Sequence, residues 1–285
     1  MKKRNILCIL LIVACLLLYR GYRMLDRIST DTTAPQINIP AEPVALSVHD
    51  SEALLLKDIT AEDNADGDVT ASLVIEKMWM TGSEGMVNVR YAAFDQSGNV
   101  AKAERQVRYT DYESPRFVLE QPLVYGQNYE YDVLSAIKAE DMLDGDISHR
   151  IRATSLDDKS MLALGVHDVE FRVSNSLGET VKLILPVEVR LAENYQADLL
   201  LTDYLVYLDV GNRFDARHYL QSFVWNGKAV SLTDGLPANC SLETGGEVDT
   251  QVPGVYSVTY EVAYTSDYSR QAVTGCSKLI VVVEG

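Results

Sequence analysis

Two stretches of this sequence gather carboxylates around an Asp-Gly-Asp triplet, and closely spaced carboxylates supply the hard oxygen ligands that Ca²⁺ prefers. Both stretches read D-x-x-D-G-D, followed by a β-branched residue and a hydroxyl residue. The candidate metal ligands are Asp63, Asp66 and Asp68 in the first stretch and Asp141, Asp144 and Asp146 in the second. Because several uncompensated carboxylates in one loop repel one another, Ca²⁺ binding is one hypothesis for both loops.

The same stretches also fit a tight turn that needs no metal. Asp-Gly is a strong turn signal, since glycine adopts positive φ and aspartate side chains cap neighbouring backbone amides. The spacing also differs from that of an EF-hand loop, in which the oxygen ligands alternate along the chain. We therefore favour the turn and keep the Ca²⁺ site as the alternative.

No other group of residues has the spacing of a catalytic motif. The chain contains no nucleophile elbow, P-loop or dinucleotide-binding glycine motif. Its four histidines, which lack any H-x-x-H arrangement, are His49, His149, His167 and His218. Paired carboxylates are too common in so acidic a chain to indicate acid–base catalysis. The sequence therefore favours a protein that is not an enzyme, with no catalytic residue and no cofactor apart from the Ca²⁺ alternative.

The carboxylate loops precede a repeated strand pattern. In residues 85–91 a turn glycine is followed by strict alternation of apolar and polar residues, which is typical of a β-strand with one buried face. The pattern returns at 165–171 and 254–260, always with valine four and an aromatic residue six positions after the glycine. His167 lies on the inward face of the second copy and is predicted to pack there. Copies spaced roughly 80 to 90 residues apart indicate three similar β units.

These motifs together resemble a bacterial Ig-like domain first noted in an insecticidal crystal protein and common in cell-surface proteins. The resemblance rests on a Pro-x-Ile opening, the acidic A-x-D-x-x-D-G-D-[VI]-[TS] phrase, the G-x-x-x-V-x-[YF] strand and a Ser-Gly-Asn hairpin. It covers residues 34–190 and extends only in outline to 191–285, where Asn226-Gly227-Lys228 replaces Asp-Gly-Asp. The resemblance implies β-sandwich domains of a surface protein.

We therefore predict an all-β chain with three tandem Ig-like β-sandwich domains after an N-terminal transmembrane helix. The predicted segments are a cytoplasmic tip at 1–4, a signal anchor at 5–19, a juxtamembrane tether at 20–33, and domains at 34–110, 111–190 and 191–285. Only about four or five residues separate the first domain from the second, which is too short for a flexible linker. The domains are expected to stack as a semi-rigid rod.

The N-terminus has the features of a membrane signal. An apolar run from Ile6 to Tyr19 follows three basic residues, and its length suits a signal-peptide core better than a full membrane span. Bulky residues follow the run, which argues against signal-peptide cleavage. We favour an uncleaved single-pass anchor with Arg20 at the far interface, with lipidation of Cys15 in a lipobox-like sequence as the alternative.

Charge excludes one class of partner. The chain carries a formal net charge of −16, and the residues after the first thirty hold 19 basic and 40 acidic side chains, a net of −21. Such a body repels phosphate backbones, so we expect no nucleic-acid partner.

Cysteine usage points to the compartment. Cys240 and Cys276 are the only cysteines after the apolar run, and both lie in the third unit. A disulfide between them would indicate an oxidising, extracytoplasmic location. The alternative is a pair of buried free thiols.

The third unit is the better candidate for recognition, because it holds 11 of the 23 aromatic residues. The candidate binding surface consists of Trp225, Tyr264 and Tyr268, and a larger aromatic core is the alternative. We expect a membrane-anchored extracellular surface protein whose domains act as a stalk and as an adhesion module for a protein or a cell-surface glycan. A purely structural spacer of the cell envelope is the alternative function, and an enzyme is the least favoured.

Overall fold

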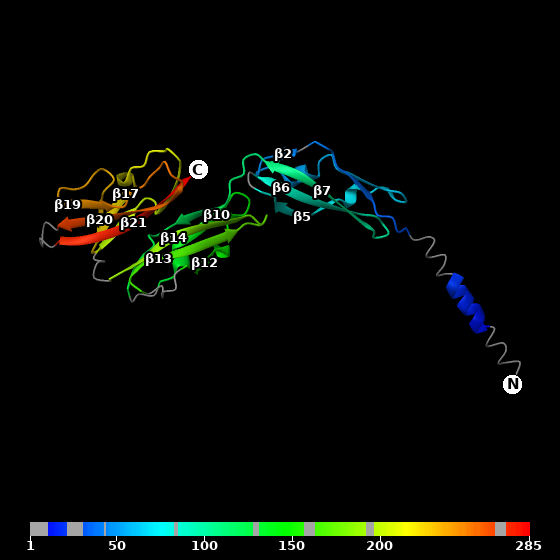
Figure 1. The fold of residues 1–285 in the computed structure, drawn as a ribbon. Coiled ribbons are helices and arrows are strands. Elements are labelled where there is room, and N and C mark those ends of the chain that lie inside the picture. Colours follow the sequence, from blue (N-terminus) through cyan, green and yellow to red (C-terminus); the bar gives the residue numbers. More distant parts are fainter. Residues whose placement is uncertain are drawn as a thin grey trace, which may run out of the picture. The chain divides into compact units, whose positions relative to one another are not determined.

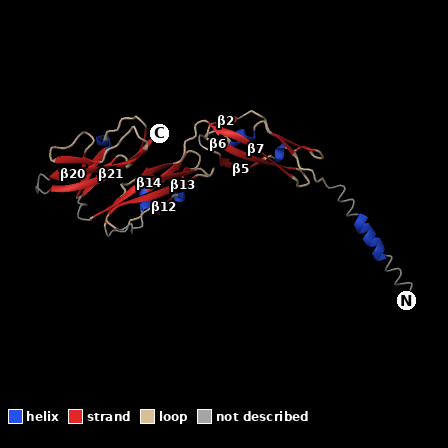
Figure 2. Ribbon diagram, in the orientation of Figure 1, coloured by secondary structure: helices blue, strands red, loops and turns tan. Residues whose placement is uncertain are grey.

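The computed structural model describes residues 11–21, 31–42, 44–82, 85–127, 131–156, 163–191, 197–265 and 272–285. β-Strands make up most of this part of the chain, as predicted (Figure 2). The chain divides into two compact units, Met1–Tyr112 and Glu113–Gly285 (Figure 1).

The first unit contains a two-sheet sandwich. One sheet has the order β1-β3-β4, with β1 (Gln36–Asn38), β3 (Thr60–Asp63) and β4 (Gly67–Asp68). The other has the order β2-β7-β6-β5, with β2 (Val44–Leu46), β5 (Val74–Met80), β6 (Met86–Phe94) and β7 (Val100–Tyr109). Two short 3₁₀ helices, η1 (Glu52–Leu56) and η2 (Thr70–Ser72), lie in the connections. β2 runs parallel to β7, and the other pairs are antiparallel.

The alternating pattern predicted for residues 85–91 is confirmed. Val87, Val89 and Tyr91 are fully buried, whereas the intervening side chains of β6 are partly exposed. Gly85 is required at the start of this strand because its φ is +71° and an added Cβ would lie 2.4 Å from the carbonyl oxygen of Tyr109. The glycine therefore marks a close approach of two backbones as well as a turn.

Residues 116–190 repeat the strand order of the first unit. The sheets are β8-β10-β11 and β9-β14-β13-β12. Their strands are β8 (Arg116–Leu119), β9 (Val124–Gly126), β10 (Ile137–Asp141), β11 (Gly145–Asp146), β12 (Arg152–Ser155), β13 (Gly165–Ser174) and β14 (Thr180–Arg190), with η3 (Val133–Ala136) and η4 (Ser148–Arg150) between them. His167 is 1% exposed, and its Nε2 lies 2.7 Å from the carbonyl oxygen of Ala163, which confirms its predicted packing role.

Residues 197–285 use equivalent strands but join the two sheets into one. The strands are β15 (Ala197–Leu201), β16 (Leu205–Asp209), β17 (Leu220–Trp225), β18 (Lys228–Ser231), β19 (Cys240–Gly245), β20 (Gly254–Thr265) and β21 (Ala272–Glu284), with η6 (Ala216–Tyr219) before β17. The order is β18-β17-β15-β21-β20-β19, and β16 also pairs with β21. β15 bridges the two halves because Ala197 and Asp198 pair with Gly275 and Cys276.

Within Glu113–Gly285 the last two sandwiches lie side by side. Glu284, at the end of β21, forms an ion pair of 3.1 Å with Arg116, at the start of β8. Six residues earlier on β21, Lys278 pairs with Glu188 near the end of β14. β21 therefore runs back along β14, and the expected end-to-end stacking is wrong for these two sandwiches.

The sequence of β21 explains this arrangement. Every residue from Ser277 to Val283 is buried, so both faces of the strand are covered. A continuous apolar run, in contrast to an alternating one, is typical of a strand that is buried on two faces. The second sandwich supplies the additional cover, and buried residues of both sandwiches form one hydrophobic cluster.

The expected signal anchor at residues 5–19 is not supported. Residues 11–21 are helical, with exposed apolar side chains such as Leu16 and Leu17, and Cys15 is exposed among them. Within the described ranges, no helix is long and apolar enough to cross a membrane. Residues 1–10 and 22–30 lie outside the described part of the chain.

The predicted disulfide between Cys240 and Cys276 is wrong, because both are free thiols. Cys240 on β19 pairs with Tyr264 of β20, whereas Cys276 on β21 pairs with Glu261. The two cysteines are thus on opposite sides of β20, about 10 Å apart across the strands, and three positions apart along them. A disulfide needs Cα atoms within about 7 Å. Burial raises the pKa of both thiols.

Candidate metal centre

The acidic loop of the first sandwich is the tight turn that the sequence favours. Oδ1 of Asp63 accepts hydrogen bonds from the backbone amides of Ala65 (2.8 Å) and Asp66 (3.0 Å). Oδ1 of Asp68 accepts one from the amide of Thr70 at 2.9 Å. Hydrogen bonds from Thr70 also lower the pKa of Asp68. These two carboxylates therefore cap successive turns between β3 and η2.

Asp66 ties this loop to the hairpin between β6 and β7. Its Oδ2 accepts a hydrogen bond of 2.8 Å from the backbone amide of Gln96. The structure therefore directs Asp66 and Asp68 to separate structural contacts. It brings only Asp63, of the three predicted ligands, into a group of carboxylates.

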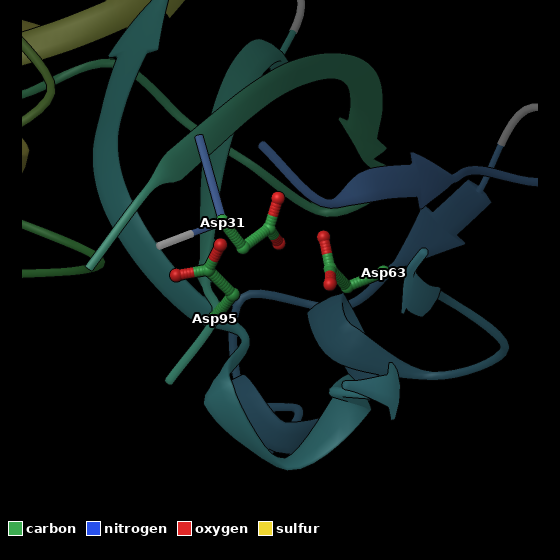
Figure 3. A group of neighbouring side chains, drawn as sticks. All are labelled: Asp31, Asp63 and Asp95. Carbon is green, nitrogen blue, oxygen red and sulfur yellow. The ribbon is translucent and has the colours of Figure 1, made fainter. Parts of the chain in front are cut away.

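That group consists of Asp31, Asp63 and Asp95, from three different segments (Figure 3). Asp31 precedes β1, Asp63 ends β3, and Asp95 follows β6. Their candidate ligand atoms all lie within 4.8 Å of one another. Asp63 and Asp95 are each 8% exposed, and Asp31 is partly buried. We call these three residues the carboxylate triad.

Two oxygens of the triad are buried without a hydrogen-bond partner among the described residues. They are Oδ2 of Asp31 and Oδ2 of Asp63. Burying a carboxylate oxygen without a partner is costly, and most such atoms in proteins are satisfied. The two orphaned oxygens therefore need a compensating positive charge or donor.

Asp95 is held in its ionised form by the hairpin. Burial by itself raises the pKa of its carboxyl group, but hydrogen bonds from the Asn99 side chain and from hairpin backbone amides outweigh burial and lower the pKa. Asn99 donates from Nδ2 to Oδ2 of Asp95 at 2.6 Å and also to the carbonyl oxygen of Asp31 at 3.1 Å. The hairpin thereby positions both Asp95 and Asp31.

The second sandwich has the same acidic loop, but there the second oxygen of the first aspartate has a hydrogen-bond donor. Oδ1 of Asp141 again accepts from the amides of Leu143 (3.0 Å) and Asp144 (2.9 Å). Its Oδ2, however, accepts a buried hydrogen bond of 3.1 Å from Nδ2 of Asn175. Asn175 follows the repeated glycine by ten residues, as Asp95 does in the first sandwich. An amide thus satisfies the oxygen that is orphaned on Asp63.

The other predicted ligands of the second loop also make structural contacts. Asp144 accepts hydrogen bonds from Ser176 and pairs with Arg150 at 2.5 Å. Asp146 accepts from the amide and hydroxyl of Ser148. Both carboxylates serve the turn and its neighbouring hairpin.

Sequence reasoning missed Asp31 and Asp95, although a signal was present. Asp31 stands four residues before Pro35, and Asp111 stands four residues before Pro115 in the next repeat. Aspartates that recur at fixed distances from repeated landmarks mark positions on the same fold. The recurrence points to Asp31, whereas Asp95 aligns with Asn175 and gives no recurring carboxylate.

The candidate binding surface is partly brought together. The rings of Trp225 and Tyr264 lie 6.2 Å apart between centroids, and Phe223 lies 5.6 Å from Tyr264. Trp225 and Tyr264 are partly exposed, whereas Phe223 is buried. Tyr268 lies outside the described residues.

Comparison with known proteins gives limited matches. No protein-family model matches the chain. A protein of Acholeplasma phage L2, described as an uncharacterized 81.3 kDa protein, is 45% identical over 58 residues, which is 20% of this chain and 8% of that protein. This chain therefore spans a small part of that relative's length.

Solved structures resemble the chain at low scores. A Clostridium perfringens ZmpB structure, of CBM51-2 in complex with GlcNAc and INT domains, matches 87% of this chain and 41% of that one, with 15% identity and a TM-score of 0.22. Drosophila N-cadherin EC1–3 matches 86% of this chain and 98% of that one, with 12% identity and a TM-score of 0.28. Protocadherin Gamma B2 extracellular cadherin domains 1–5 match 70% and 46%, with 10% identity and a TM-score of 0.20.

Proposed function

We propose that this chain is a bacterial surface protein that acts outside the cytoplasm as a stalk and an interaction module, without catalytic activity. Its N-terminal apolar run would hold it at the membrane, and its ligand would be a protein or a cell-surface glycan. The observation that supports the proposal best is the side-by-side packing of the last two sandwiches in Glu113–Gly285, which share ion pairs and one hydrophobic cluster.

The packing of the two sandwiches against each other includes an ion pair that is largely shielded from solvent. Lys278 is 4% exposed and pairs with Glu188 at 2.5 Å, while Arg190 contacts the same carboxylate at 2.6 Å. Burial raises the pKa of Glu188, but its two cationic partners outweigh burial and lower it. Removing one partner of such a pair is strongly destabilising, so the pair fixes the relative placement of the sandwiches.

A fixed pair of sandwiches suits a binding role. A preorganised surface loses little conformational freedom when a ligand binds, which favours affinity. The partly exposed Trp225 and Tyr264 offer aromatic area of the kind that anchors protein and sugar ligands. We assign them as the contact residues of the module.

The test uses the full-length chain in detergent micelles, probed on a glycan array and in pull-downs with surface proteins. Trp225→Ala should weaken any binding at least tenfold, since aromatic anchors dominate interface energetics. Trp79→Ala, in the first unit, is the matched control and should leave binding unchanged. If the wild-type protein binds neither glycans nor surface proteins, the interaction-module hypothesis is wrong and the structural-spacer hypothesis is retained.

The spacer remains the second candidate because the repeated strand order and the two-sided burial of β21 are also what a load-bearing element needs. Surface labelling of intact cells tests the location that both candidates share. Full-length protein that is inaccessible to an impermeant reagent would contradict both.

A further inference from the structure

We propose that the carboxylate triad Asp31, Asp63 and Asp95 binds one Ca²⁺, and that the second sandwich binds none at the equivalent position. This inference goes beyond the proposed function and does not depend on it. It also replaces the sequence-based ligand set for the first loop, since only Asp63 is common to both.

Two buried carboxylate oxygens of the triad have no hydrogen-bond donor among the described residues, which indicates a site for a cation. Asp63 is more than nine-tenths buried, and its Oδ2 has no donor among the described residues, although its Oδ1 accepts two hydrogen bonds. Figure 3 shows this carboxylate facing Asp31, whose Oδ2 is also buried without a described partner. A cation between the carboxylates would satisfy both oxygens and offset the repulsion of three like charges.

The geometry and the ligand chemistry favour Ca²⁺. Ca²⁺ binds oxygens at about 2.4 Å, so two ligands on opposite sides are about 4.8 Å apart. The candidate ligand atoms of the triad lie within that span. All three side chains offer hard carboxylate oxygens, which do not suit metals that prefer imidazole or thiolate. Water would complete the six to eight ligands that Ca²⁺ takes.

The second sandwich supplies an internal comparison. Asn175 replaces the third carboxylate, and its amide donates to the Asp141 oxygen that corresponds to the orphan on Asp63. Asp111, the counterpart of Asp31, instead accepts hydrogen bonds from the Ser47 hydroxyl (2.6 Å) and the Val48 amide (2.9 Å). The second sandwich therefore lacks the carboxylate that Asp95 supplies in the first, and its Asp141 oxygen already has a donor.

The proposed cation would connect three segments of the first unit. Asp31 is the first residue of the described range 31–42, before β1, whereas Asp63 ends β3 and Asp95 lies in the β6–β7 hairpin. Ca²⁺ would thus fasten the point at which the chain enters the sandwich.

The experiment is thermal unfolding of the full-length chain in EDTA and in Ca²⁺. Ca²⁺ at a hundredfold excess over its Kd should raise the Tm of the first unit by roughly 10 °C. Hydrogen exchange of the β6 amides assigns the transition to that unit. An unchanged Tm would overturn the proposal.

The decisive variant is Asp95→Asn, which copies the second sandwich. It should remove the Ca²⁺-dependent shift while the protein in EDTA unfolds at the same or a higher temperature, because the new amide can donate to Asp63. Asp68→Asn, in the same loop but outside the triad, is the matched control and should keep the full shift. A shift that survives in Asp95→Asn and disappears in Asp68→Asn would overturn the triad.

Equilibrium dialysis with radioactive calcium provides a readout that does not depend on unfolding. Wild-type chain and Asp68→Asn should each bind one ion, and Asp95→Asn and Asp31→Asn should bind none. Binding of two ions by the wild type, or of one by Asp31→Asn, would contradict the proposal.

Discussion

Nδ2 of Asn175 donates a hydrogen bond of 3.1 Å to Oδ2 of Asp141, and this bond replaces a third carboxylate in the second sandwich. In the first sandwich no described residue donates to the corresponding oxygen of Asp63. Two copies of one loop thus differ in net charge at a buried position. The difference determines which copy needs a cation.

The first prediction concerns Asn175→Asp. The change removes the hydrogen bond to Asp141 and places two carboxylates together at a buried site, so the free energy of unfolding should fall by about 2–4 kcal/mol at neutral pH. Urea unfolding of the full-length chain measures this loss. Asn64→Asp, on the exposed part of the first loop, is the control and should change stability by less than about 0.5 kcal/mol. Equal effects at both positions would show that the buried hydrogen bond contributes nothing.

The second prediction concerns pH and Asp144. Burial raises the pKa of this carboxyl group, but hydrogen bonds from Ser176 and Arg150 and the charge of Arg150 outweigh burial and lower the pKa. A carboxyl group whose pKa is lower in the folded state stabilises the fold above its unfolded pKa, and that stability is lost as pH falls through the folded pKa.

Asp144→Asn should therefore cost about 1–3 kcal/mol at pH 7. The difference from wild type should begin to shrink below about pH 4, the pKa of an unfolded Asp, and should vanish as pH falls through the lower pKa of the folded state. Urea midpoints measured across this range check the trend, and the exposed Asp168→Asn serves as the control. A cost that stays constant down to pH 2 would contradict the electrostatic explanation.

Local pattern was sufficient to predict the strands but not the cation site. The alternation of Val87, Val89 and Tyr91 fixes which face is buried, because side chains of a strand alternate between its two faces. Asp31 and Asp95 are 32 residues on either side of Asp63, and only the packing of two sheets brings them together. Their meeting could be inferred only from repeated landmarks, not from local spacing.

The side-by-side packing of the last two sandwiches was missed for a different reason. The stretch Lys278–Val283 is rich in β-branched residues, and its lack of alternation indicates burial on two faces. The sequence does not state what covers the second face. The disulfide was favoured over the free thiols because cysteine count gives no information about register across β20.

The third prediction concerns two buried tyrosine hydroxyls. Tyr91 donates to the carbonyl oxygen of Leu55 and Tyr260 to that of Ala216, both at 2.8 Å. Tyr91→Phe and Tyr260→Phe should each cost about 1–2 kcal/mol, because a buried or partly buried carbonyl loses its donor. Tyr256→Phe removes an exposed bond to Val252 and should cost less than about 0.5 kcal/mol. Chemical unfolding of the full-length chain distinguishes the two classes, and equal costs for all three variants would contradict the role of burial.

The fourth prediction concerns the thiols. Because Cys240 and Cys276 are free and separated by β20, a reducing agent should leave the Tm unchanged. A thiol reagent should modify both residues after denaturation without prior reduction. Mass spectrometry of the non-reduced protein gives an independent count. A fall in Tm on reduction, or a mass lower by two hydrogens, would show that a disulfide forms.

The last prediction compares two ion pairs between the same two sandwiches. Lys278 is 4% exposed, whereas the side chains of Arg116 and Glu284 are 48% and 41% exposed. Lys278→Ala leaves the largely buried Glu188, 16% exposed, with one cationic partner fewer and should cost about 3–5 kcal/mol. Arg116→Ala removes a solvated pair and its contact with the Tyr207 ring, and should cost about 1 kcal/mol or less.

Hydrogen exchange of the β21 amides in the full-length chain measures both effects where they occur. Lys278→Ala should accelerate exchange along the buried run, since that strand loses its attachment to the second sandwich, and Arg116→Ala should accelerate it little. Raising the salt concentration should diminish the effect of Arg116→Ala more than that of Lys278→Ala, because buried pairs are screened less than exposed ones. Equal protection of β21 in wild type and Lys278→Ala would show that apolar burial alone holds the two sandwiches together.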